Sequence, residues 1–262
     1  MSAPFRRWTR PWLARRLLRA IRRASGRRVV PLTVVRAIRA VGGGESPLAA
    51  RPRPTTAATL ENARLRELLD GVELGTWALG PRSIDEVVRT VREVRPEAVL
   101  EFGSGSSTVV LAWAIREIWG GDAPRRIVSV EQDETQAERT RSLLSRAGLD
   151  DQAMVVVAPL AEQEIEGDRT TCYLLPGALV EAVDGRPVDL VLIDGPAGPA
   201  GVRFGTLPLA RPIARVGARF VLDDALRDGE LDIARRWSRL PYARVSGIRL
   251  IEHGLLVGTM TA

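Results

Sequence analysis

The amino-acid sequence predicts an α/β protein with a doubly wound, mostly parallel, seven-stranded Rossmann-like sheet. Between residues 60 and 240, short apolar runs alternate with longer segments of helical periodicity. Such alternation is typical of a parallel sheet that is covered by helices on both faces. The chain then ends in two apolar segments, 242–251 and 255–260, joined by a short turn without a helix. We expect these two segments to form a C-terminal antiparallel hairpin at the sheet edge.

The boundaries of the other elements follow from the same periodicity. The runs expected to form parallel strands are 97–102, 127–130, 153–157, 188–193 and 218–222. The segments expected to form helices are 60–69, 83–94, a segment through 113–118, and 134–147. Ser83-Ile84-Asp85-Glu86 has the residue types of a capping box, in which two side chains satisfy free backbone N–H groups. We therefore expect a helix to begin at Ser83.

The length of 262 residues fits one catalytic domain with an appendage. The only cysteine is Cys172, so no intramolecular disulfide can form, and a reducing, cytoplasmic location is expected. All 38 basic residues are arginine, which resembles the codon bias of a GC-rich bacterial genome. We expect Cys172 to be an inert residue.

Charge divides the chain into two parts. Residues 1–56 contain 14 arginines and one acid, Glu45, whereas residues 57–262 contain 24 arginines and 31 acids. We predict that 1–56 is a basic N-terminal extension with a linker, and that 57–262 is the catalytic domain. An acidic body makes a nucleic-acid groove in the enzyme itself unlikely, because phosphate contacts need a basic surface.

The N-terminal extension alternates apolar and basic residues with an approximately helical period over residues 5–39. Two interpretations stay open: a basic extension that is loose or packed on protein, and a helix that contacts an anionic membrane at the inner membrane face. Arginines interrupt every apolar stretch, so no segment is expected to span a bilayer.

The strand at 97–102 leads into the glycine-rich turn Gly103-Ser104-Gly105, and a helix follows. This arrangement brings bare backbone and a helix N-terminus against a ligand at the carboxyl edge of the sheet. Glu131 ends the second strand, where a carboxylate can accept hydrogen bonds from both hydroxyls of a ribose. The pattern indicates a nucleoside-bearing cofactor.

Two residues discriminate between cofactors of this kind. Thr108 occupies the position at which the pyrophosphate-binding pattern requires Gly or Ala. Glu101, next to the turn, would repel a pyrophosphate but can pair with a cationic amino-acid group, directly or through water. S-adenosylmethionine is therefore favoured over a nicotinamide dinucleotide.

Three segments of this sequence resemble class I S-adenosylmethionine-dependent methyltransferases, and the similarity covers about residues 60–262. These are Glu101-Phe102-Gly103-Ser104-Gly105-Ser106-Ser107, Val130-Glu131, and Val191-Leu192-Ile193-Asp194-Gly195-Pro196. The expected terminal hairpin is also similar to that family. Further segments around residues 158–160, 173, 203 and 221–225 resemble a largely uncharacterised bacterial branch of the class.

The resemblance implies a role for each matching position. Glu101, Gly103, Gly105 and Ser107 would hold the methionine portion of the cofactor. Glu131 would hold the ribose. Gln132 and the segment around Ala158 and Leu160 would contact the edge of the adenine.

Asp194, Asp223 and Asp224 follow the fourth and fifth strands, so we expect them at the same edge as the cofactor. Three carboxylates can bind Mg²⁺, and the arrangement is similar to the catechol O-methyltransferase branch. The sequence departs from that branch because Asp224 stands where Asn is usual and no Lys follows Asp194 nearby. Three interpretations stay open: a metal site formed by all three residues, Asp194 or Asp223 as a catalytic base or substrate contact, and structural capping.

Other side chains receive less specific expectations. Tyr173 and Arg203 lie in connections flanking the fourth strand, so each is expected either to contact the substrate or to pack at the surface. His253 is the only histidine, and we expect it to be a turn residue remote from the strand carboxyl ends. Trp113, Trp119 and Trp237 are expected in the core.

The sequence thus predicts transfer of a methyl group from S-adenosylmethionine to an oxygen of a small-molecule, sugar or lipid-linked acceptor. Two alternatives stay open: a non-catalytic interaction protein with a cofactor-type fold, tethered by its basic extension, and a nicotinamide-dependent oxidoreductase.

Overall fold

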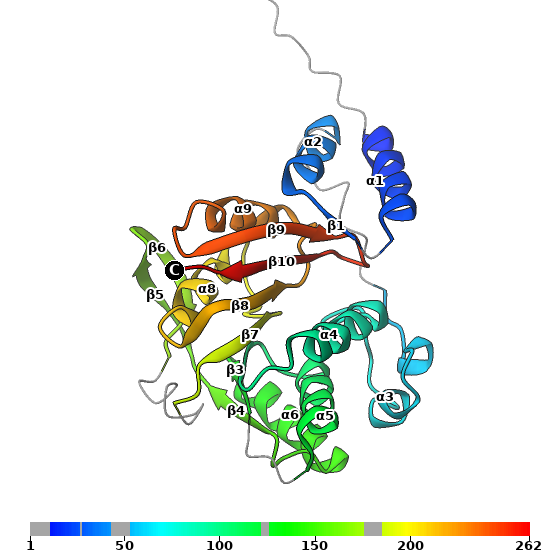
Figure 1. Ribbon diagram of the computed structural model, residues 1–262, viewed down its shortest axis with the longest axis vertical. Helices are drawn as coiled ribbons and strands as arrows, with labels where there is room; N and C mark the ends of the chain where they lie inside the picture. The colour runs from blue at the N-terminus through cyan, green and yellow to red at the C-terminus, as the bar shows by residue number, and fades with distance from the viewer. Residues whose placement is uncertain (1–10, 27, 43–52, 122–125, 176–184) are drawn as a thin grey trace, which may run out of the picture.

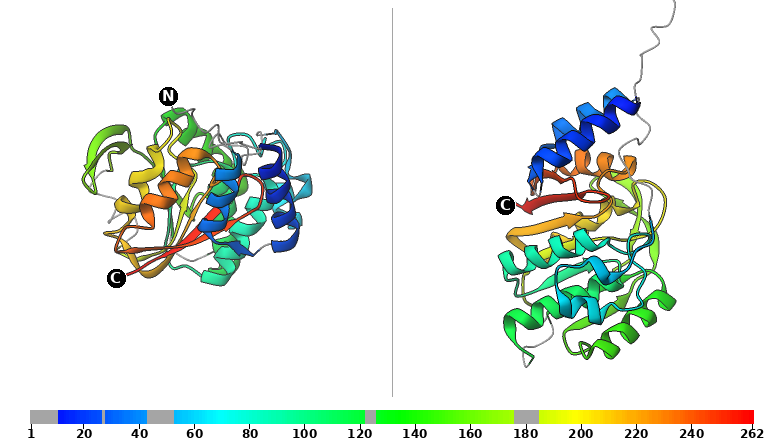
Figure 2. Two further views of the ribbon diagram at one scale, coloured as in Figure 1. Left: turned by 90° about the horizontal axis from the view of Figure 1, so that it is seen from above. Right: turned by 90° about the vertical axis from the view of Figure 1, so that its right-hand side faces the viewer.

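The computed structural model describes residues 11–26, 28–42, 53–121, 126–175 and 185–262. A sheet with the strand order β1-β9-β10-β8-β7-β2-β3-β4 forms its centre, and helices cover both faces (Figures 1 and 2). The predicted doubly wound α/β fold is confirmed.

The parallel part of the sheet contains five strands. They are β2 (Val99–Phe102), β3 (Ile127–Glu131), β4 (Ala153–Val157), β7 (Val188–Ile193) and β8 (Ala214–Leu222). Strand β2 pairs in parallel with both β3 and β7, and β8 continues the sheet beyond β7. All five positions were predicted, although β8 begins four residues before the expected Ala218.

The C-terminal hairpin consists of β9 (Ala243–Arg249) and β10 (Leu255–Met260), and β10 also pairs antiparallel with β8. The sequence predicted that this hairpin would form the sheet edge. The structure differs, because neither of its two strands is the outermost strand. The two-residue strand β1 (Val29–Val30) pairs with the free side of β9 and adds an eighth strand. A short strand of this kind covers backbone groups that a bare edge would expose.

The structure contains a second hairpin that was not predicted from the sequence. Strands β5 (Leu160–Ile165) and β6 (Asp168–Tyr173) pair antiparallel in a separate two-stranded sheet. Polar residues dominate both strands, so they lack the apolar run that marks a buried strand.

Helices bury the two faces of the sheet in two separate cores. The first core takes side chains from α3 (Ala63–Leu68), α4 (Pro81–Val94), α5 (Ser106–Trp119) and α6 (Glu134–Ala147). The second takes them from η2 (Val202–Gly205), α8 (Thr206–Ala210) and α9 (Asp228–Trp237). Because successive side chains of a strand point to opposite faces, Leu190 and Leu192 enter the first core, whereas Val191 and Ile193 enter the second.

The N-terminal extension also joins the second core. Helices α1 (Pro11–Ser25) and α2 (Leu32–Gly42) lie side by side at the end of the sheet formed by β1 and β9 (Figures 1 and 2). Their inner faces contribute Ala14, Leu18, Val35 and Ile38 to that core. None of the helices within the described residues has the length and apolarity that crossing a membrane requires. The domain boundary at residue 56 stays a prediction. Residues 43–52, which belong to the expected linker, lie outside the described residues.

The expected start of α4 at Ser83 is wrong. The helix begins two residues earlier at Pro81, and Ser83 lies inside its first turn. Gly80 at the N-cap has no side chain to accept a hydrogen bond, and the Glu252 carboxylate takes that role instead. It accepts from Arg82 N at 3.2 Å and from Ser83 N at 3.0 Å. A side chain 169 residues away therefore caps the helix, which local sequence cannot reveal.

Replacing Glu252 by Ala should lower the free energy of unfolding by about 1–2 kcal/mol, because two backbone N–H groups lose their acceptor. Urea denaturation followed by circular dichroism measures the effect. Glu117→Ala, at an exposed position of α5, is the matched control and should change stability by less than about 0.5 kcal/mol. Equal effects of both variants would show that Glu252 does not cap α4.

Candidate active site

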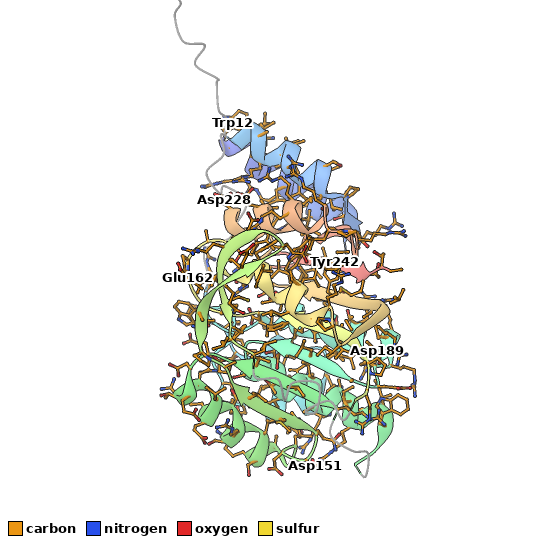
Figure 3. All side chains as sticks on the ribbon, turned by 90° about the vertical axis from the view of Figure 1, so that its left-hand side faces the viewer. Trp12, Asp151, Glu162, Asp189, Asp228 and Tyr242 are labelled. Carbon is orange, nitrogen blue, oxygen red and sulfur yellow. The ribbon has the colours of Figure 1, made fainter. Side chains whose placement is uncertain are left out.

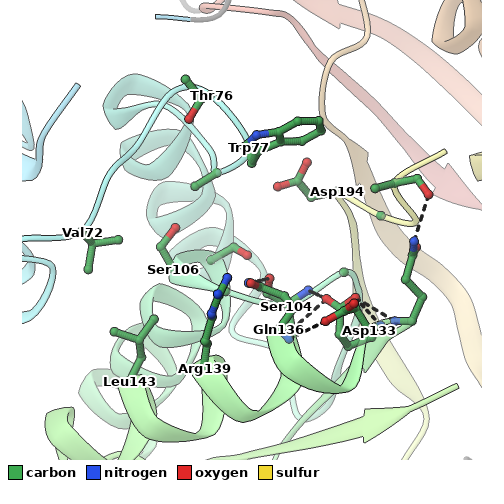
Figure 4. A pocket seen from close by; sticks show the side chains of 18 of the residues that line it. Val72, Thr76, Trp77, Ser104, Ser106, Asp133, Gln136, Arg139, Leu143 and Asp194 are labelled. Atoms are coloured by element: carbon green, nitrogen blue, oxygen red, sulfur yellow. Dashed lines mark hydrogen bonds between the residues drawn. The ribbon is translucent and has the colours of Figure 1, made fainter. Parts of the chain in front are cut away.

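A pocket of about 590 Å³ opens at the carboxyl edge of the sheet (Figure 4). Its walls come from the turn after β2, the end of β3, the first turns of α6, the loop 72–78 and the segment after β7. In Figure 4, Trp77 and Asp194 lie at one end of the pocket, and Val72, Arg139 and Leu143 lie at the other. The pocket lies where doubly wound sheets bind their ligands.

The glycine-rich turn forms the floor of this pocket. Gly103 has a φ of +92°, and a Cβ at this position would lie 2.9 Å from Gly195 N. Only glycine allows the ends of β2 and β7 to approach this closely. The turn therefore exposes backbone to the pocket without a side chain in between.

Helix α5 begins directly after this turn, so its N-terminus faces the pocket. Ser106 and Ser107 are its first residues and line the pocket. The Ser106 hydroxyl is buried and has no hydrogen-bond partner among the described residues. Unpaired N–H groups at a helix N-terminus and a free hydroxyl form a binding site for a carboxylate.

Glu131 lines the pocket at the end of β3 and is held rigidly. Its Oε2 accepts from Ser104 N and the Ser104 hydroxyl, both at 3.0 Å. Its Oε1 accepts from Gln132 N at 2.7 Å and Asp133 N at 3.1 Å. The Ser104 hydroxyl also lies 2.9 Å from the Thr140 hydroxyl. It can therefore turn away from Glu131 and leave that carboxylate free to accept from a ligand hydroxyl.

Glu101 lies beneath the turn, fully buried, and does not line the pocket. The hydroxyls of Thr108 and Ser129 donate to its Oε2, the Thr108 bond at 2.7 Å. Burial raises the pKa of Glu101 to about 7, although the hydroxyls of Ser107, Ser129 and Thr108 act in the opposite direction. Ser129 was not predicted; a buried serine within the apolar run 127–130 was the available signal.

Thr108 explains why the sequence departs from the dinucleotide pattern. Its hydroxyl accepts from Gly105 N at 3.1 Å and donates to Glu101, so it links the turn to the buried carboxylate. Gly or Ala, which the pyrophosphate pattern requires here, would remove both bonds. Thr108 therefore stabilises the glycine-rich turn by linking it to the buried Glu101 carboxylate.

Asp194, Asp223 and Asp224 come together as predicted, with carboxylate oxygens within 4.8 Å of one another. Their environments differ. Burial raises the pKa of Asp194 to about 7 and raises that of Asp223 well above its ordinary range, to which the charges of its two neighbours add. The pKa of Asp224 is lowered by His253, Arg203 and Arg227, although burial acts in the opposite direction. Asp224 is therefore favoured in its ionised form, whereas the protonated form is favoured at Asp223, and Asp194 titrates near neutral pH.

Arg203, Arg227 and His253 surround Asp224. The Arg227 guanidinium lies 2.8 Å and that of Arg203 3.4 Å from Asp224 Oδ2, while His253 Nδ1 lies 3.4 Å from Oδ1. The expectation that His253 is remote from the strand ends is wrong. Strand β10 runs antiparallel to β8, so the turn before β10 lies beside the residues that follow β8.

Arg203 lies inside the carboxylate cluster with only 7% of its side chain exposed. It donates to the backbone oxygen of Asp194 at 2.7 Å, and the same nitrogen lies 3.7 Å from Asp194 Oδ1. The guanidinium thus supplies positive charge from within the cluster. It does not line the pocket.

These residues do not fit a divalent cation. A metal site needs ionised oxygen ligands with free lone pairs. Both oxygens of Asp224 already face Arg203, Arg227 or His253, burial disfavours the ionised form of Asp223, and the buried Arg203 would repel a second cation. Three close carboxylates remain compatible with the base and capping interpretations.

The other predicted site residues divide into two groups. Gly103, Gly105, Ser107, Glu131, Gln132, Tyr173 and Asp194 line the pocket, whereas Glu101, Ala158, Leu160, Arg203, Asp223 and Asp224 do not. Tyr173 is buried, stacks on Phe102 with ring centroids 5.6 Å apart, and has a hydroxyl without a partner among the described residues. Cys172 is buried, and burial raises the pKa of its thiol to about 11, as expected of an inert residue.

One wall of the pocket was not predicted from the sequence, and one tryptophan that was expected in the core is exposed. Val72, Glu73, Thr76 and Trp77 line the pocket from a loop without a recognisable motif. The Trp77 side chain is 89% exposed. Trp113 and Trp237 are buried as expected, but Trp119 is 37% exposed, and its indole N–H donates to Pro96 O at 3.0 Å.

Residues 100–225 match the model of a family described as a methyltransferase domain. This part of the chain is a class I methyltransferase domain. The match begins within β2 and ends just after Asp224, so it contains the glycine-rich turn, Glu131 and all three aspartates. A search of curated protein sequences gave no significant match.

Solved structures with the same fold as this methyltransferase domain include three with bound cofactor or product. The O-methyltransferase from Bacillus cereus, in complex with S-adenosylhomocysteine, is 18% identical, with a TM-score of 0.56 over 78% of this chain and 93% of that chain. The O-methyltransferase TomG from Streptomyces achromogenes, in complex with S-adenosylmethionine, is 17% identical, with a TM-score of 0.53 over 79% and 93%. A methyltransferase from Podospora anserina, bound to S-adenosylhomocysteine, is 13% identical, with a TM-score of 0.54 over 100% and 99%.

Millimolar Mg²⁺ should leave the affinity of the methyltransferase domain for S-adenosylhomocysteine unchanged within about twofold, because Arg203 already supplies the local positive charge. Electron paramagnetic resonance with Mn²⁺ measures metal binding directly and should show no saturable site. Micromolar Mn²⁺ binding that disappears in Asp223→Asn would contradict this expectation.

Stability should fall as pH rises from about 4.5 to 7, because the folded state keeps Glu101 protonated where the unfolded chain releases the proton. Glu101→Gln should reduce this pH dependence by up to about 3 kcal/mol, the energy of a pKa difference of about 2.5 units. Urea denaturation at pH 5 and pH 8 measures it. Glu162→Gln, at an exposed position of β5, should keep the slope of the unaltered protein.

Proposed function

We propose that this protein transfers a methyl group from S-adenosylmethionine to an oxygen atom of a small-molecule, sugar or lipid-linked acceptor. One observation carries the proposal: Asp194, a carboxyl group with a pKa near 7, lines the same pocket as the glycine-rich turn and Glu131. A group that titrates near neutral pH is suited to accept a proton there.

The cofactor fits the residues that form the pocket floor. The Gly103 turn offers a cradle that a Cβ would fill, and the N-terminus of α5 with the free Ser106 hydroxyl suits the methionine carboxylate. Ser107 and Gly105 complete this wall. Glu101, buried beneath the turn, would favour a cationic amino group above it once it loses its proton.

Glu131 would hold the ribose. When the Ser104 hydroxyl turns towards Thr140, Glu131 Oε2 becomes free for a ribose hydroxyl. Gln132 would contact the adenine from the next position, with Ala158 and Leu160 forming the apolar support behind the pocket.

When bound, S-adenosylmethionine supplies a methyl group on a positively charged sulfur, which departs as a neutral thioether. The chain's own residues then have two tasks: to align the acceptor oxygen and to accept its proton. Asp194 takes the proton as the new carbon–oxygen bond forms. Tyr173, whose hydroxyl has no partner among the described residues and lies near Gly195, would orient the acceptor.

Asp194 is better suited to this role than its neighbours. The pKa of Asp223 is raised further from its ordinary range by burial and by its two acidic neighbours, and Asp223 does not line the pocket. Asp224 is held by Arg203, Arg227 and His253. We assign Asp223 and Arg203 to positioning: Arg203 holds Asp194 through its backbone oxygen and so fixes where the base stands.

Calorimetric titration with S-adenosylhomocysteine tests the cofactor assignment. Binding should be micromolar in the unaltered protein, and Glu131→Ala should weaken it about 10- to 100-fold, because the charge-assisted hydrogen bond from a ribose hydroxyl to Glu131 Oε2 is lost. Glu162→Ala removes an exposed carboxylate far from the pocket and should bind like the unaltered protein. Asp194→Asn should keep the affinity within about threefold, because its side chain faces the acceptor.

Two outcomes would contradict the proposal. If the folded protein does not bind S-adenosylhomocysteine, the interaction-protein alternative gains support, and a change in nicotinamide fluorescence on mixing would instead favour the oxidoreductase. If Asp194→Asn still methylates hydroxyl compounds from a panel, measured with tritiated S-adenosylmethionine at the unaltered rate, Asp194 is not the base.

A further inference from the structure

Two arginines fix the helical hairpin α1–α2 to the body of the protein. Arg22 donates to the backbone oxygen of Glu252 at 2.6 Å, and Arg39 lies 2.9 Å from Asp228. Together with Ala14 and Leu18, which are buried in the second core, these contacts hold the hairpin in one orientation. Its outer surface therefore faces away from the sheet.

This outer surface is strongly basic. Residues 11–42 contain no acidic residue, and six exposed arginines pair with no acidic side chain of the described residues. They are Arg15, Arg16, Arg19, Arg23, Arg28 and Arg36. Five of these charges lie on the two helices and Arg28 lies in the segment between them, and together they form a binding surface for a polyanion.

Exposed apolar side chains accompany these charges. Trp12 is 55% exposed and lies on α1 at the top of Figure 3, above the other labelled side chains. Arg16 stacks on its ring at 5.8 Å, and the spacing of Trp12, Arg16, Arg19 and Arg23 brings all four to one side of α1. Leu17, Val34 and Val41 are the other large apolar side chains exposed on this hairpin.

We propose that the outer surface of α1–α2 docks on an anionic lipid bilayer. Arginines would pair with lipid phosphates, while Trp12 would enter the interfacial region. The exposed aliphatic side chains favour lipid over nucleic acid, because they give no hydrogen bonds to base edges, whereas the interfacial region of a bilayer removes their apolar area from water. Binding through this surface is independent of the proposed methyl transfer.

The hairpin α1–α2 and the candidate pocket lie at the same edge of the sheet. Strand β1 pairs with the end of β9, and the turn after β9 contacts both Arg22 and Asp224. The hairpin therefore emerges from the carboxyl edge, at which the pocket also opens.

Co-sedimentation of the full-length chain with vesicles tests the proposal. Vesicles of phosphatidylcholine with a third of phosphatidylglycerol should bind the protein, and pure phosphatidylcholine vesicles should not. The triple variant Arg16→Gln, Arg19→Gln, Arg23→Gln should weaken partitioning about 100-fold, from about fivefold per arginine near the surface. Trp12→Ala should weaken it several-fold at unchanged charge.

The matched control is Arg146→Gln, Arg169→Gln, Arg239→Gln, which removes the same charge from exposed positions of the body. It should retain most of the binding. Equal losses in both triple variants would overturn the proposal, because net charge alone would then explain the attraction. Tighter binding to a single-stranded RNA or a DNA duplex than to the anionic vesicles at the same salt concentration would also overturn it.

Discussion

Backbone hydrogen bonds at the carboxyl ends of β2, β3 and β7 hold the candidate site together. Gly103 N donates to Val130 O at 2.8 Å, and Asp194 N and Gly195 N donate to Phe102 O at 2.9 and 2.8 Å. These bonds continue the parallel pairing one step beyond the strands. They place the glycine-rich turn between Glu131 and Asp194, so cofactor-binding and proton-accepting groups share one pocket. The missing side chain of Gly103 is the condition for this approach.

A second constraint comes from charge. Three carboxylates within 4.8 Å of one another cannot all be ionised in a buried environment without a cation. Arg203 and Arg227 provide positive charge on the side of Asp224, where His253 also contacts it, and burial favours the protonated form of Asp223. This asymmetry leaves Asp194 as the carboxyl group that titrates near neutral pH. The cluster thus becomes a site for proton transfer although its composition resembles a metal site.

The turn from 251 to 254 connects parts that are distant in the sequence. The Glu252 carboxylate caps α4, its backbone oxygen accepts from Arg22 of α1, and the adjacent His253 contacts Asp224. One turn therefore joins the N-terminal hairpin, the helix after the pocket loop and the carboxylate cluster. Its position follows from the antiparallel direction of β10, which returns the chain to the carboxyl edge of the sheet.

The sequence by itself determined the order of the central strands and helices, the glycine-rich turn, Glu131 and the convergence of the three aspartates. These features depend on local periodicity and on the rule that parallel strands end at one edge. Only the tertiary structure decided the roles of Arg203, His253, Glu252 and Trp77, the extra strand β1 and the polar hairpin β5–β6. Each of these depends on contacts between segments far apart in the chain, and their own sequences carry no periodic or motif signal. The electrostatic difference among Asp194, Asp223 and Asp224 has the same origin, because burial and neighbouring charges set a pKa and exist only after folding.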